Sequence, residues 1–139
     1  MKSRKYNYED SKINIKLKLA ALWTTVMFLY IYGDYFELYV PGKVAGLLHG
    51  QNLLNTPYTL LLASIILTIP SLMIFLSLII KPTWNRVSNI VVAAFFTLFT
   101  LFVGASSFSE WRIFYVMLSF LESTITATIV WLALRWPKI

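Results

Sequence analysis

The sequence predicts an all-α membrane protein, a four-helix transmembrane bundle with up-down-up-down topology, forming one domain over residues 1–139. Of its 139 residues, 58% are hydrophobic and only 13% are charged, about half the charged fraction of a typical soluble domain. The hydrophobic residues fall into four runs of roughly 20 residues or more, enough for a helix to cross a hydrocarbon core of about 30 Å. We place the spans at about residues 19–40, 59–80, 87–108 and 111–136.

The basic residues predict how these spans are oriented. Most of the 12 lie before the first span, between the second and third spans, or after the fourth. With four spans, these three regions share one side of the membrane, and the other side has only Lys43 and Arg112. The positive-inside rule therefore predicts a multi-pass membrane protein with its N-terminus and C-terminus both in the cytoplasm.

The basic N-terminus also bears on partners. A cluster running from Lys2 to Lys18 beside a first span is typical of contact with anionic lipid head groups of the bilayer. Nucleic acid is not expected, because no nucleic-acid-binding motif accompanies the charge. The chain has no cysteine, which excludes thiol nucleophiles and thiolate metal sites. We predict no cofactor, and the pattern leaves a homo-oligomer open.

The helix starts and the longest connection are marked by capping and turn residues. Asp10 or Ser11 is expected to cap a helix that continues into the first span. The connection at residues 41–57 favours a short interfacial helix or a segment folded over the outer mouth of the bundle. Its last residues, Asn55 to Pro57, are typical of a turn followed by a helix start.

Proline and small residues inside the spans predict local packing. Pro70 should kink the second span, and nearby hydroxyl groups are expected to cover the carbonyl that it frees. Thr100 and Gly104 form a small-xxx-small pair in the third span, which predicts a close approach to another helix. At the start of the third span, the polar side chains favour helix capping and head-group contact, or else partner recognition. These side chains are those of Asn85, Arg86 and Asn89.

Acidic residues inside the spans are the candidates for function. Asp34 lies about 9 Å and Glu122 about 16 Å from the outer ends of their helices. A carboxyl group at such a depth needs a partner or a proton, and it is a functional hypothesis by default. Helical spacing places the acids on two inward faces that also carry tyrosine and serine. We predict an outward-facing polar pocket formed by Tyr30, Asp34, Glu37, Arg112, Ser119 and Glu122.

Three functions fit this constellation. The pocket could bind or pass a small ligand, cation or proton. Alternatively, the acids only hold helices together in a structural or interaction subunit. Glu122 would then be neutral or hydrogen-bonded to a tyrosine such as Tyr30, a serine or a threonine, and Asp34 and Glu37 would pair with Arg112. The third is a small membrane enzyme using paired carboxyls as acid and base. No motif identifies a reaction, a catalytic residue or a metal site, so we lean against an enzyme.

Several short motifs resemble a bacterial family of four-span integral membrane proteins of unknown function. They are Ile69-Pro70-Ser71-Leu72-Met73, Leu76-Ser77 and Asn85-Arg86-Val87-Ser88-Asn89-Ile90. That family has a similar first helix and an acid in its last helix, matching Leu22-Trp23, Asp34 and Glu122, near a tryptophan-rich end like Trp131 and Trp136. The resemblance extends over about residues 15–136. It implies a bacterial inner-membrane protein and carries no activity with it.

Overall fold

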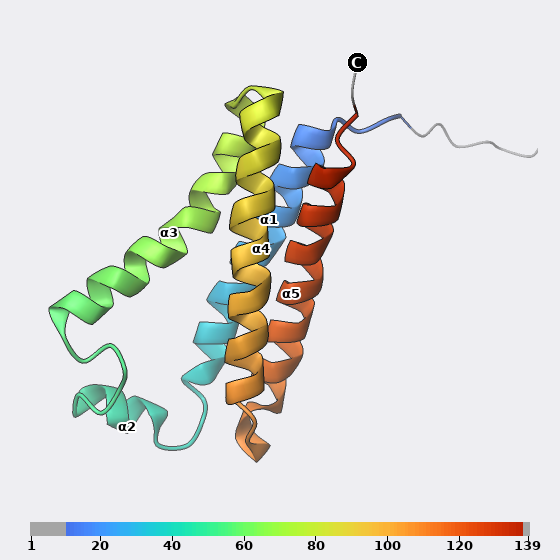
Figure 1. Cartoon of the computed structure of the whole chain (residues 1–139). Coiled ribbons are helices and arrows are strands. Elements are labelled where there is room, and N and C mark those ends of the chain that lie inside the picture. Colours follow the sequence, from blue (N-terminus) through green and yellow to red (C-terminus); the bar gives the residue numbers. More distant parts are fainter. Residues whose placement is uncertain (1–10, 138–139) are drawn as a thin grey trace, which may run out of the picture.

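The computed structural model describes residues 11–137, and in this part the chain is helical and has no strand. Consecutive long helices run in opposite directions, so the start of α1 (Ile15–Glu37) and the end of α5 (Ile113–Leu134) lie at the end of the bundle opposite α2 (Lys43–Leu48) (Figure 1). We call these two ends the termini side and the α2 side. The elements are α1 (Ile15–Glu37), α2 (Lys43–Leu48), α3 (Pro57–Ile79), α4 (Pro82–Ser106), the 3-10 turn η1 (Glu110–Arg112) and α5 (Ile113–Leu134).

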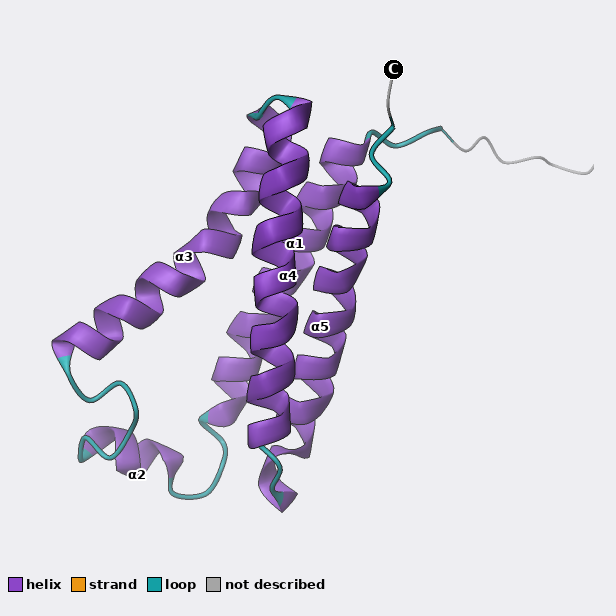
Figure 2. Ribbon diagram, in the orientation of Figure 1, coloured by secondary structure: helices purple, strands orange, loops and turns teal. Residues whose placement is uncertain are grey.

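Within residues 11–137, four helices meet the length and composition needed to cross a membrane. They are α1, α3, α4 and the continuous segment of η1 and α5, with 23 to 25 residues each. Large apolar side chains remain exposed along all of them, which suits contact with lipid tails rather than water. The predicted all-α four-helix bundle is therefore confirmed, and the chain is a multi-pass membrane protein. Short loops join the helices except around α2 (Figure 2).

α1 begins later than the sequence suggested. Asn14 caps it, with its side-chain oxygen accepting a hydrogen bond from the backbone N–H of Lys16 at 2.9 Å. The expectation of a cap at Ser11 is wrong, because the residue that immediately precedes and caps the helix is Asn14, and Asp10 falls outside the described residues. The Lys16 ammonium donates to the carbonyl of Ile80 at 2.7 Å. A cation at this position stabilises the last turn of α3, where the helix dipole is negative.

α3 begins where the turn residues predicted, and α2 is the short helix expected in the preceding connection. Pro57 occupies the first turn of α3. Thr56 and Thr59 form a capping box, in which each side chain bonds to the backbone N–H of the other. This arrangement satisfies two backbone donors that a helix start leaves unpaired.

Pro70 divides α3 into two parts that pack differently. The buried residues of α3 are Pro70, Met73 and Ser77, so none lies before the proline. The part before Pro70 leans away from α4 and α5 on the α2 side (Figure 1). Proline lacks the N–H that would bond to the carbonyl of Ile66. The expected cover by nearby hydroxyl groups is wrong, because those of Ser64, Thr68 and Ser71 bond to other carbonyls.

The tightest apolar packing lies on the termini side. Trp23 and Phe96 are its largest side chains, and their rings meet edge to face with centroids 6.4 Å apart. Because lipid tails are themselves apolar, such packing stabilises the bundle mainly through van der Waals contact. The core cluster comprises Leu19, Trp23, Met73, Ala93, Phe96 and Ile129.

A buried network of hydrogen bonds links α1, α3 and α4 beside this core. The Trp23 indole donates to the Asn89 side-chain oxygen at 2.8 Å. The Asn89 amide donates to the Asn85 side-chain oxygen at 2.7 Å, and the Asn85 amide donates to the Ser77 carbonyl at 2.6 Å. Both asparagines are almost fully buried. The expectation that they serve head-group contact is therefore wrong. We call these four residues the asparagine network.

The close approach predicted for Thr100 and Gly104 occurs inside the chain, between α4 and α5. The Thr100 hydroxyl is 2.8 Å from that of Ser123. A Cβ atom added to Gly104 would lie only 2.8 Å from the Cβ of Ser119. Both positions are buried against α5, so this surface is already occupied and is not free for contact with a second copy of the chain.

Candidate functional site

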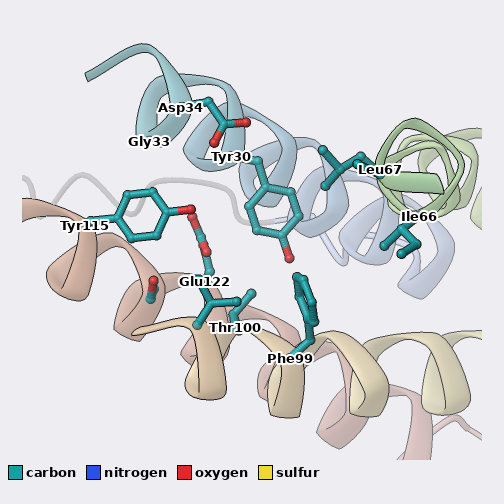
Figure 3. Close-up of a pocket in the computed structure, with 12 residues that line it drawn as sticks. Tyr30, Gly33, Asp34, Ile66, Leu67, Phe99, Thr100, Tyr115 and Glu122 are labelled. Carbon is teal, nitrogen blue, oxygen red and sulfur yellow. The ribbon is translucent and has the colours of Figure 1, made fainter. Parts of the chain in front are cut away.

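A cavity of about 230 Å³ lies between the four long helices, on the α2 side of the core (Figure 3). It lies beside the part of α3 that precedes Pro70. Its polar side is formed by α1 and α5, and its apolar side is formed mainly by α3 and α4. An engineered cavity of about 150 Å³ binds benzene in another protein. The space is therefore adequate for a molecule somewhat larger than benzene.

Glu122 is the most deeply placed acid on the polar side. Glu122 is 6% exposed, and its side chain faces the cavity (Figure 3). Within residues 11–137, its carboxyl group makes no hydrogen bond and no ion pair. The Tyr30 hydroxyl is buried and likewise has no hydrogen-bond partner in the described part. The expected bond between Tyr30 and Glu122 is therefore not formed, although both line the same cavity.

Glu37 and the cations of the α2 side form a separate cluster. A single oxygen of Glu37 accepts from Lys43 at 3.0 Å and from Arg112 at 2.5 Å. These contacts join the end of α1 to the start of α2 and to η1. Glu37 and Arg112 do not line the cavity, so two members of the predicted pocket lie outside it. The expected pairing of Arg112 with Asp34 is wrong, because Arg112 contacts Glu37.

The remaining predicted residues lie around the cavity at different depths. Asp34 lines it but is exposed, and it forms no ion pair with another described residue. Ser119 lines it from α5 and is buried where α5 meets Gly104. The cavity thus contains two acids, Asp34 and Glu122, without ion-pair partners in the described chain. The nearby cations pair with Glu37, which lies outside the cavity.

Sequence reasoning missed the apolar side of the cavity. α3 contributes Ala63, Ile66 and Leu67, and α4 contributes Phe99 and Val103. In the sequence, these residues are indistinguishable from those that face lipid. The one available signal was Pro70, because a proline within a span allows the two parts of a helix to follow different directions.

The chemistry of the lining limits what this site can hold. Within the described residues, no group of three or more histidine, aspartate or glutamate side chains could hold a metal ion. The carboxyl groups of Asp34 and Glu122 accept hydrogen bonds, and the hydroxyls of Tyr30 and Tyr115 can donate or accept them. The arrangement is suited to non-covalent binding of a molecule with both polar and apolar parts.

Residues 5–139 match a family described as a family of unknown function, DUF6326. The chain belongs to this family. The match covers nearly the whole chain, and the four candidate membrane helices fit the four-span family of unknown function that the sequence motifs resemble. No match was found among curated proteins or among solved structures.

Proposed function

We propose that this membrane protein binds a small ligand in the cavity, with Glu122 as the principal polar contact. The observation that carries the proposal is a buried glutamate that faces a cavity and whose carboxyl group has no partner among the described residues. An ionised carboxyl group without a partner is strongly unfavourable inside a membrane protein. A bound molecule would supply the missing partner. The unpartnered hydroxyl of Tyr30 offers a second polar contact to the same molecule.

The distribution of basic residues supports a location for this site in the outer half of the membrane. The positive-inside rule favours cytoplasmic termini in a bacterial inner membrane. In that orientation, the α2 side faces outward, and the cavity lies in the outer half of the bundle. The ligand would then reach the cavity from outside the cell or from the outer leaflet.

Packing between the cavity and the termini side favours binding over passage. Trp23, Phe96 and Ile129 are completely buried there. The Phe96 ring also contacts the Tyr30 ring, with centroids 6.3 Å apart. These side chains occupy the space through which a ligand would have to continue. Binding is therefore the function we propose for the described arrangement.

Filling the cavity tests this proposal. Benzylamine and benzyl alcohol are suitable probes, because each is slightly larger than benzene and they differ mainly in charge. We expect at least one of them to bind saturably to the protein in lipid nanodiscs, as measured by calorimetry against empty nanodiscs. Ala63→Trp would place an indole in the cavity from the loosely packed part of α3, and it should abolish this binding.

The matched control is Ala105→Trp, which adds the same side chain at an exposed position of α4. It should bind the probe as the wild type does. Two results would contradict the proposal. One is that neither probe binds saturably to the wild type, and the other is that Ala63→Trp binds as tightly as Ala105→Trp.

A further inference from the structure

The charges around the cavity favour a positively charged ligand. Asp34 and Glu122 both line it, and no lysine, arginine or histidine among residues 11–137 does. On the α2 side, Lys43 and Arg112 both form ion pairs with Glu37. An anion placed in the cavity would meet two acids and no cation. A cation would instead give the buried carboxyl of Glu122 an opposite charge in a medium where such pairs are little screened.

The aromatic lining favours an ammonium group over a metal ion. The rings of Tyr30, Phe99 and Tyr115 line the cavity together with Glu122 (Figure 3). Aromatic faces attract ammonium groups, and the attraction grows when water is excluded. Hard metal ions instead require about six or more oxygen ligands. Within the described chain, no cluster of candidate metal ligands is present.

The rest of the lining favours an apolar body attached to that ammonium. Ile66 and Leu67 of α3 and Val103 of α4 form this side of the cavity. They offer no polar group in their side chains, so they suit a hydrocarbon or an aromatic ring. The volume of about 230 Å³ accommodates a ring with a short substituent.

We infer that the cavity selects a small organic ammonium ion, a protonated amine carried on an apolar body of about benzyl size. The inference rests on the proposed function, since it names the chemical class of ligand for the same site. Glu122 pairs with the ammonium, Tyr30 and Tyr115 surround the charge, and the apolar residues of α3 and α4 contact the body.

The two benzyl probes test this selectivity at neutral pH, where alkyl amines are protonated. Benzylamine should bind to the wild type roughly 10-fold to 100-fold more tightly than benzyl alcohol, the range expected for hydrogen bonds to a charged group. Glu122→Gln should remove most of this preference, because the glutamine amide carries no charge to attract the ammonium. The control is Glu110→Gln, which makes the same charge change at an exposed residue outside the cavity and should keep the preference.

Two results would overturn the inference while leaving the proposed function intact. The first is equal binding of benzylamine and benzyl alcohol to the wild type. The second is an unchanged preference in folded Glu122→Gln, with both probes still excluded by Ala63→Trp. If Glu122→Gln does not fold, the wild-type ratio of the two affinities decides the matter. Failure of both probes to bind the wild type would overturn the proposed function itself.

Discussion

Replacing Gly104 with leucine is expected to lower the free energy of unfolding by about 3 kcal/mol, near the upper end of overpacking effects. The first added carbon would lie 2.8 Å from the Cβ of Ser119, and a Cβ atom cannot move without its backbone. α4 and α5 would therefore have to separate. That separation would also disturb the hydroxyl contact between Thr100 and Ser123. The measurement is reversible unfolding in mixed detergent micelles.

The control for Gly104→Leu is Ala105→Leu. Ala105 is the adjacent residue and is exposed, so the same leucine meets no other helix there and should leave stability nearly unchanged. Gly104→Ala should fall between the two variants, because it introduces the colliding carbon alone. Equal stability of Gly104→Leu and Ala105→Leu would show that α4 and α5 do not approach closely at this position.

Asn89→Leu is expected to lower the free energy of unfolding by about 1–3 kcal/mol, the range for leaving a buried polar group without a partner. The substitution removes the acceptor for the Trp23 indole and the donor to Asn85. The Trp23 indole and the Asn85 side-chain oxygen would then remain buried without these partners. The same unfolding measurement reports the loss.

A double-mutant cycle tests whether this loss comes from the asparagine network. Trp23→Phe removes the indole donor, so Trp23→Phe combined with Asn89→Leu should destabilise by less than the sum of the two single changes. Thr83→Leu is a control that removes a polar side chain from an exposed position of α4. The network would be unimportant if Asn89→Leu were as stable as Thr83→Leu, or if the two changes in the cycle were simply additive.

Hydrophobic runs and connection residues predicted most of the fold. Four spans, the short helix in the long connection and the start of α3 all follow from local composition and capping chemistry. The partners of Asn85 and Asn89 could not be predicted, because a polar residue near the end of a span can equally contact lipid head groups or join a buried network. Only the arrangement of α1 and α3 around α4 reveals that these two side chains have partners inside the protein.

The polar side of the candidate site was easier to predict than its apolar side. Helical spacing placed Tyr30, Asp34, Ser119 and Glu122 on inward faces, and all four line one cavity. The sequence could not assign the cations, because Glu37 and Asp34 lie within one helical turn and both were compatible with Arg112. Nor could it separate Phe99 from residues facing lipid, since both environments favour the same apolar side chains.

The two halves of the bundle differ in the same way as the two parts of α3. On the termini side, the asparagine network and the aromatic core hold α3 against α1 and α4. On the α2 side, the part of α3 before Pro70 has no buried residue and borders the cavity. A firmly packed end thus supports a loosely packed end, where a ligand can occupy space without disrupting the core.

A magnetic-resonance contact between Glu122 and a bound amine would test the ligand site most directly. Solid-state NMR on protein carrying carbon-13 in its glutamate carboxyls, with nitrogen-15 benzylamine bound, reports the distance between these nuclei. We expect a contact of about 3–4 Å, as in a charge-assisted hydrogen bond, that disappears in Glu122→Gln and persists in Glu110→Gln. Bound benzylamine without such a contact, or a contact that survives Glu122→Gln, would contradict the assignment of Glu122 as the ligand's partner.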